Sequence, residues 1–231
     1  AEDVPLAIAR AYYIAMQEPQ GPVLVSVPAD DWARTCEPVA PRVVSSVVRP
    51  DAAVLATIAG KLDAAQRPAF VIGAAVDRSG AWDEVLQLAE RHNAAVFVAP
   101  MSGRCGFPED HRLFSGFLPA MREKIVSLLN GHDVVFALGA PAFTYHVEGF
   151  GPHLPEGAEL VQLIDDPSIA AWAPVGTSAG GNIKAGVRDR VDLGGAGLIE
   201  ERRFAACNGG AGGRRLLAGL RGGAEHGGGR L

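Results

Sequence analysis

His146 is the residue in this sequence with the clearest capacity for acid–base chemistry. It closes the run Gly-Ala-Pro-Ala-Phe-Thr-Tyr-His at residues 139–146, directly after an apolar segment at 134–138 that is typical of a buried strand. An imidazole has a pKa near neutrality and can donate or accept a proton at physiological pH. We therefore take His146 as the candidate catalytic residue. Judged alone, a loop histidine is more often a solvated side chain, and that interpretation applies more strongly to His111, His132 and His153.

A Gly-x-Ser-x-Gly sequence at residues 176–180 has the spacing of a hydrolase nucleophile elbow, with Ser178 at its centre. Such an elbow needs a buried strand before the serine and a helix after it. Here Ala-Pro precedes the motif, Gly-Asn follows it, and the histidine in hydrolase order is His226, within a glycine-rich tail. We interpret residues 176–180 as a turn of small residues.

Asp165 and Asp166 follow an apolar segment at 159–164. An acid at a strand end binds a ribose hydroxyl in dinucleotide-binding folds. The order Asp-Pro also favours a simpler role, in which Asp166 caps a helix that begins at Pro167. Because no Gly-x-Gly-x-x-Gly follows a strand, we favour the capping role.

Several motifs are missing, and their absence excludes classes of site. The sequence contains neither a P-loop nor His-Glu-x-x-His, and its histidines are not spaced as metal ligands. The three cysteines, Cys36, Cys105 and Cys207, are far apart and form no Cys-x-x-Cys pair, and no neighbouring base stands out to activate Cys105. We expect no metal ligands and no cofactor-binding residues in this chain.

The composition is that of an ordinary globular protein, with 231 residues, 48% hydrophobic, and a formal net charge of −5. This charge argues against a nucleic-acid or anionic-lipid partner. No apolar run reaches the length of about 18 residues that a membrane span needs, and the first residues lack a secretion pattern. We predict a cytoplasmic location without membrane contact.

Helices and strands are expected to alternate from residue 51 onward, with short connections between them. This alternation predicts an α/β fold with a doubly wound, mostly parallel sheet covered by helices on both faces. The ligand crevice of such a sheet lies beyond the carboxyl ends of its strands, where His146 would stand. The expected strands are residues 69–73, 95–98, 134–138 and 159–164, with a weaker one near 182–185.

The two ends of the chain differ from this pattern. Residues 5–17 predict a helix with Asp3 as a possible cap, residues 23–27 predict a strand, and residues 33–50 read as a proline-containing linker. Thirteen of the 29 glycines lie between Gly194 and the last residue, so the tail 193–231 is expected to be disordered. The missing initiator Met leads us to expect a fragment.

Short motifs in a fixed order give the sequence a resemblance to thiamine-diphosphate-dependent 2-oxoacid decarboxylases, most of all to the benzoylformate decarboxylases. The resemblance covers about residues 1–190. Two differences are Thr144, where the family has Arg, and Gly106, where it has Pro. The motifs are Gln-Gly-Pro-Val at 20–23, Ser-Val-Pro at 26–28, Asp-Asp-Trp at 30–32, Ser-Ser-Val at 45–47, Val-Ala-Pro at 98–100, Arg104-Cys105 with Phe107-Pro108, Gly-His-Asp-Val-Val at 131–135, residues 139–146 and Asp166-Pro167.

The resemblance implies a domain plan. Residues 1–32 would be the last helix and strand of a pyrimidine-binding domain, and residues 51–192 a Rossmann-like central domain. The family binds thiamine diphosphate and Mg²⁺, and its binding residues would lie outside this chain. His146 would act as a proton donor in decarboxylation of an aromatic 2-oxoacid, before the aldehyde is released.

By this resemblance the chain is a carboxy-lyase by family that is expected to be inactive alone, and full-length relatives form homotetramers. Two alternatives stay open at this stage. One is a free-standing nucleotide- or FAD-binding module, and the other is a non-catalytic truncated product.

Overall fold

The computed structural model describes residues 1–193 of the chain. The chain divides into two units, 1–196 and 197–231, of which the second lies outside the described residues. The disorder predicted for 193–231, together with Cys207 and His226, falls almost wholly there, so these expectations stay predictions.

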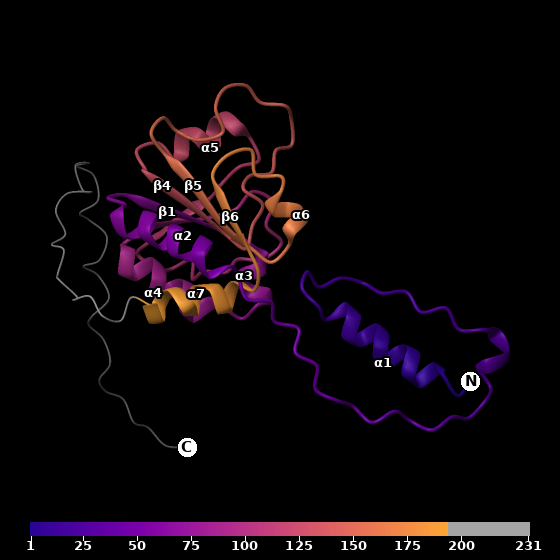
Figure 1. Cartoon of the computed structure of the whole chain (residues 1–231). Helices are drawn as coiled ribbons and strands as arrows, with labels where there is room; N and C mark the ends of the chain where they lie inside the picture. The colour runs from indigo at the N-terminus through magenta and orange to yellow at the C-terminus, as the bar shows by residue number, and fades with distance from the viewer. Residues whose placement is uncertain (194–231) are drawn as a thin grey trace, which may run out of the picture. The chain divides into compact units, whose positions relative to one another are not determined.

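Six parallel strands of the described chain form one sheet in the order β3-β2-β1-β4-β5-β6 (Figure 1). The order reverses at β1, which pairs with β2 on one side and with β4 on the other. This is a doubly wound sheet, as the alternating pattern predicts. The strands are β1 Pro68–Ile72, β2 Ala95–Val98, β3 Phe114–Phe117, β4 Val134–Leu138, β5 Glu159–Ile164 and β6 Thr177–Gly180.

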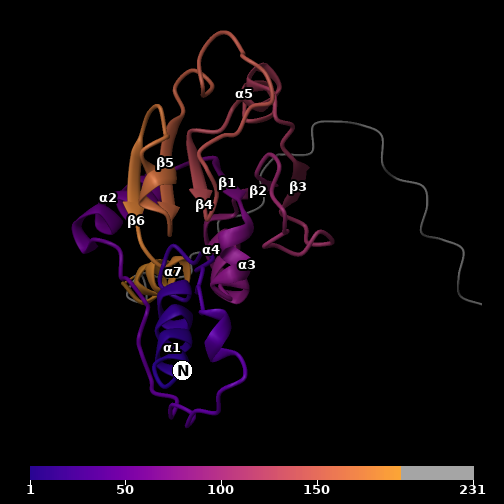
Figure 2. The ribbon, with the colours of Figure 1, turned by 90° about the vertical axis from the view of Figure 1, so that its right-hand side faces the viewer.

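Helices cover one face of the sheet, and a helix with a long loop covers the other (Figure 2). The first face packs under α2, α3, α4 and α7, and the second under α5 and the segment 139–158. Both faces of β1 and β4 are therefore buried, which explains their continuous apolar sequences. The helices of this region are α2 Ala52–Ala64, α3 Ala74–Arg78, α4 Trp82–His92, α5 Arg122–Leu128, α6 Pro167–Ala170 and α7 Ile183–Leu193.

Helix caps explain where two of these helices begin. The Asp51 carboxylate accepts the N–H groups of Ala53 and Val54 at 2.8 and 3.0 Å and so starts α2. Asp166 caps α6 in the same way, accepting the N–H of Ser168 at 2.8 Å. The capping role predicted for Asp166 is confirmed, and Asp51 has the same role at the start of α2.

The N-terminal segment contains α1 Val4–Ala15 and the 3-10 turn η1 Ala29–Asp31. No residue of α1 is buried, and the Asp3 side chain makes no capping hydrogen bond, contrary to expectation. Tyr13 closes the segment: its hydroxyl donates to the Arg42 carbonyl at 2.7 Å and accepts the Arg42 N–H at 2.9 Å. The strand predicted at 23–27 is not formed, because no described strand pairs with it.

Two strand predictions differ from the structure. The weak strand expected near 182–185 is wrong, because Asn182 accepts the Ala185 N–H at 2.9 Å and starts α7 there. The turn of small residues expected at 176–180 is also wrong, because residues 177–180 form strand β6. Strand β3 is not among the expected strands.

Candidate functional site

His146 lies on the loop between β4 and β5, and its side chain is exposed. Its backbone N–H donates to the carbonyl of Ala120 at 3.0 Å. Ala120 lies three residues after the end of β3, and the Leu118 N–H between them binds the carbonyl of Val98, the last residue of β2. The structure therefore places His146 beside the carboxyl ends of the strands, with its main chain fixed.

Tyr145, the residue before His146, is held from two sides. Its hydroxyl lies 3.0 Å from Nδ1 of His153, and the Arg122 guanidinium lies 5.0 Å from the centre of its ring. Burial raises the pKa of the Tyr145 phenol, so the phenol keeps its proton. Because Arg122 donates to the phenol oxygen, we assign the hydroxyl proton to the contact with His153. Burial, reinforced by the Arg122 charge, lowers the pKa of His153, which suits a neutral acceptor.

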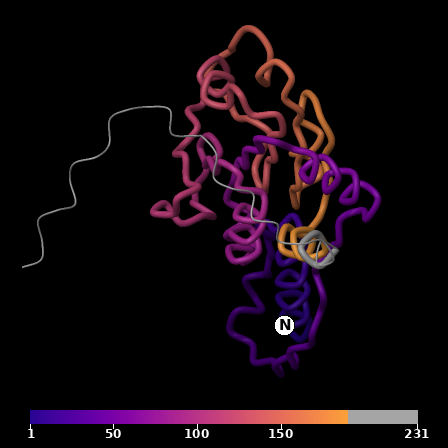
Figure 3. The backbone as a smooth tube through the Cα atoms, turned by 90° about the vertical axis from the view of Figure 1, so that its left-hand side faces the viewer, coloured from indigo at the N-terminus to yellow at the C-terminus, as the bar shows by residue number. Residues whose placement is uncertain are grey.

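The backbone of the same loop passes close to α5 (Figure 3), and hydrogen bonds attach the tip of the loop to the first turn of that helix. The Phe150 N–H donates to Glu123 Oε1 at 2.9 Å, and Arg122 donates to the Gly151 carbonyl at 3.3 Å. Gly149 lies so close to Arg122 that an added Cβ would come within 2.7 Å of the arginine Cβ. The loop that carries His146 is therefore held at Tyr145 and His146 and again at its tip, residues 149–151.

Apolar side chains near His146 in the sequence remain exposed to solvent. Val147 is 62% exposed, Phe150 is 79% exposed, and Met121, next to Ala120, is 40% exposed. Exposed large apolar groups on one loop and the segment bonded to it can pack against another surface. We call Met121, Val147 and Phe150 the rim around His146; these side chains could pack against a second protein surface.

The crevice between β1 and β4 is filled by the chain itself. The Gly139 carbonyl accepts the Ala75 N–H at 3.1 Å, at the beginning of α3, where a phosphate sits in dinucleotide-binding folds. A Cβ added at Gly73 would lie 2.5 Å from the Gly139 oxygen. This packing argues against a nucleotide at the beginning of α3.

Ion pairs tie other strand-end loops together. Arg78 of α3 binds Asp165 after β5 at 2.8 Å, and Arg104 binds Asp77 at 2.5 Å. The hydrogen bond from Arg104 is the main reason that the pKa of Asp77 is lowered. Because Asp165 pairs with Arg78 and Asp166 caps α6, neither aspartate is arranged to bind a ribose.

Ser178 has a structural role in the described chain. It lies within β6, and its hydroxyl donates to Oε1 of the buried Gln162 at 2.8 Å, while Gln162 Nε2 donates to the Ala140 carbonyl at 2.9 Å. A helix does follow β6, because α7 begins at Ile183, but Ser178 lies inside the strand and not at the turn between strand and helix where a nucleophile would stand. Cys105 donates to the Phe107 carbonyl at 3.0 Å, and Cys36 and Cys105 are free thiols.

The described residues contain no cluster of three or more histidine, cysteine, aspartate or glutamate side chains that could hold a metal ion. None of the described helices combines the length and apolar character needed to cross a bilayer. The contact between Tyr145 and His153 was not predictable from the sequence. Their separation of eight residues in a loop without periodicity gave no signal for it.

Comparison with known proteins places these features in a family. Residues 55–188 match the family model of the thiamine pyrophosphate enzyme central domain. Benzoylformate decarboxylase of Pseudomonas aeruginosa is 42% identical over 187 residues, which cover 79% of this chain and 35% of that protein. The chain thus spans about a third of the length of this relative.

Solved structures agree with this assignment. Benzoylformate decarboxylase from Polynucleobacter necessarius has a TM-score of 0.77 and 39% identity, over 83% of this chain and 36% of that one. The 4-hydroxybenzoylformate decarboxylase of Rhodococcus jostii RHA1, described as thiamine diphosphate-dependent, has a TM-score of 0.74 and 36% identity, over 83% and 37% of the two chains. Sequence and fold together show that this chain belongs to the thiamine pyrophosphate enzymes, whose central domain it contains.

Proposed function

We propose that this chain forms part of a thiamine-diphosphate-dependent decarboxylase of an aromatic 2-oxoacid and contributes His146 as a proton donor. The observation that carries the proposal is the position of His146, which is exposed beside the strand ends with its backbone fixed to Ala120. The substrate class is supported by 42% identity to a benzoylformate decarboxylase.

The described residues do not fit a site for the cofactor itself. They offer no cluster of metal ligands, and the crevice between β1 and β4 is filled by Gly139. We therefore assign the binding of thiamine diphosphate and of a divalent metal to polypeptide outside the described residues. The relatives, about three times as long as the matched segment, have room for such domains.

The chemistry assigned to His146 is the delivery of one proton. When a 2-oxoacid loses carbon dioxide, the electron pair of the broken C–C bond remains at the former keto carbon. This carbon must gain a proton before an aldehyde can leave. An imidazolium at the edge of the site can donate that proton, and the imidazole regains a proton from solvent when the site opens to release the aldehyde.

The exposed rim around His146 supports the same arrangement. Val147 and Phe150 would be covered when a second surface closes over the loop, and water would be excluded from the imidazole. The attachments of Phe150 to Glu123 and of Tyr145 to His153 would keep the imidazole in one place during this closure.

A chimera tests the proposal. The segment of the Pseudomonas benzoylformate decarboxylase that this chain matches is replaced by the sequence of this chain, and benzoylformate turnover is measured with thiamine diphosphate and Mg²⁺. We expect an active chimera in which H146A lowers kcat by about 10²-fold or more, while the control H111Q leaves kcat unchanged. An active chimera that is indifferent to H146A would refute the role of His146.

The chain alone gives a second measurement. We expect no benzoylformate turnover by the 231-residue chain when the cofactor and Mg²⁺ are added. Turnover by this chain would contradict the assignment of the cofactor to other polypeptide.

A further inference from the structure

A cavity of about 430 Å³ lies at the amino ends of β5 and β6, the edge of the sheet opposite to the strand ends described above. Its volume is within the usual range for small-molecule sites. Three of its lining side chains are polar, and the remaining lining is mainly apolar. The polar ones are Lys61, His153 and Glu159, and the apolar ones are Pro152, Leu154, Ala158, Leu160 and Val175.

His153 presents a hydrogen-bond donor on its second nitrogen. We take the Tyr145 hydroxyl, 3.0 Å from Nδ1, as the donor of this hydrogen bond, because Arg122 already donates to the phenol oxygen and the hydroxyl proton is left for His153. A neutral imidazole that accepts at Nδ1 carries its proton on Nε2. His153 can therefore donate an N–H to an acceptor in the cavity that it lines.

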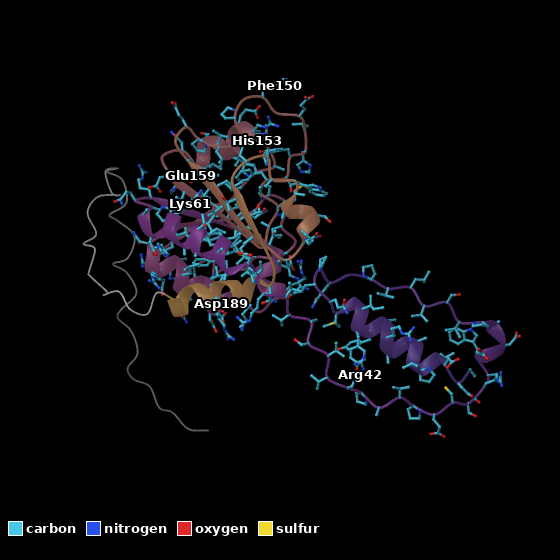
Figure 4. The ribbon with its side chains drawn as sticks, in the orientation of Figure 1. Arg42, Lys61, Phe150, His153, Glu159 and Asp189 are labelled. Carbon is cyan, nitrogen blue, oxygen red and sulfur yellow. The ribbon has the colours of Figure 1, made fainter. Side chains whose placement is uncertain are left out.

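Lys61 supplies positive charge to the same cavity. It comes from the last turn of α2, and its ammonium pairs with Glu159, the first residue of β5, at 2.7 Å (Figure 4). The side chain of Glu159 is 61% exposed, so solvent screens this pair. An anionic ligand can share or replace the glutamate as partner of Lys61.

We propose that this cavity binds a monocarboxylate with an apolar body. The carboxylate would accept from Lys61 Nζ and from His153 Nε2–H, and the apolar body would pack against Leu154, Leu160 and Val175. A neutral or cationic ligand would not pair with the Lys61 ammonium. A carboxylate without an apolar body would leave the apolar side chains of the cavity exposed to water. The recognition therefore requires both parts of the ligand.

Benzoate is a suitable probe, because it combines a carboxylate with a ring of the appropriate size. The experiment is an NMR titration of the 231-residue chain with ¹⁵N-labelled histidine, following the His153 imidazole. We expect a saturable shift of Nε2 with a Kd on the order of 1 mM, a value typical of a ligand with so few non-hydrogen atoms. Acetate and benzylamine serve as controls that lack the apolar body and the negative charge, respectively.

Three variants test the roles of the charges. K61Q is expected to weaken benzoate binding about fivefold, and E159Q is expected to tighten it about threefold, because the competing carboxylate is removed. K124Q changes an exposed lysine of α5 that does not line the cavity, so it should have no effect. Circular dichroism establishes that each variant is folded.

K61Q and E159Q are expected to change benzoate affinity in opposite directions, which makes the proposal falsifiable. It is overturned if benzoate gives no saturable shift at His153, if benzylamine or acetate binds as tightly as benzoate, or if K61Q and E159Q weaken binding equally. The measurement uses neither turnover nor thiamine diphosphate, so its result is independent of the role proposed for His146.

Discussion

Replacing Gly73 by alanine tests whether the crevice between β1 and β4 is filled by the main chain. The new methyl carbon would lie 2.5 Å from the Gly139 oxygen and 2.6 Å from the Ala140 Cβ, both below any normal contact. The backbone of residue 73, with φ −119° and ψ −177°, is itself open to alanine, so the cost is steric. Overpacking of this kind lowers the free energy of unfolding by about 1–3 kcal/mol.

A matched glycine gives the opposite expectation. Gly60 lies inside α2, and apart from its own helical backbone no atom lies within 4 Å of an added Cβ. Alanine there should raise the free energy of unfolding by about 0.5–1 kcal/mol, since it removes the entropic penalty of a helical glycine.

Urea unfolding followed by far-UV circular dichroism measures both variants. With an m value of about 2.5 kcal/mol/M, the midpoint of G73A should fall by about 0.4–1.2 M, while that of G60A should rise slightly. A G73A variant as stable as the parent would refute the reasoning, because it would mean that Gly139 does not occupy the crevice in solution. Binding of ADP to that variant would then deserve measurement by calorimetry.

Two further outcomes are expected. The S178A substitution removes the donor to Oε1 of the buried Gln162, so it should lower the free energy of unfolding by about 1–3 kcal/mol, and an unchanged urea midpoint would show that water replaces the hydroxyl. Burial lowers the pKa of His132 and of His153 in the folded chain below the ordinary value of 6.5. The unfolded chain therefore binds more protons than the folded chain once the pH falls to about 6.5. The free energy of unfolding should then fall as the pH drops from 7 toward the folded-state pKa values, by at most about 1.4 kcal/mol per pH unit for each imidazole. The H132Q/H153Q variant should show a shallower slope of urea midpoint against pH, and an equal slope would contradict this assignment.

The parallel sheet could be predicted from sequence because its central strands are buried on both faces. Such strands are continuous apolar segments, as at 68–72 and 134–138, and they stand out without knowledge of their neighbours. Strand β3 lacked this signal, because Phe114–Phe117 contains Gly116 and alternates between half-buried and exposed residues. Strand β6 was missed for a similar reason, since its four residues are all small.

The candidate site was predictable only in part. The place of His146 followed from the rule that loops after parallel strands gather at one edge. The contacts that fix the loop around His146 could not be predicted. Tyr145 contacts Arg122 of α5 and His153 of its own loop, and no periodic pattern in the sequence links these positions. Residues 23–27 show the reverse situation: their sequence has the β-propensity of a strand, but no neighbouring strand of the described chain pairs with them.

The carbonyl of Gly139 at the start of α3 also sets a limit on engineering. Grafting a glycine-rich nucleotide motif after β1 would not suffice to turn this sheet into an adenylate sensor, because the β4 connection already occupies the phosphate position. A designer would first have to reroute the chain after Leu138, and that rerouting would move the loop that presents His146. The chain after Leu138 therefore cannot be rebuilt to admit a nucleotide without also displacing His146.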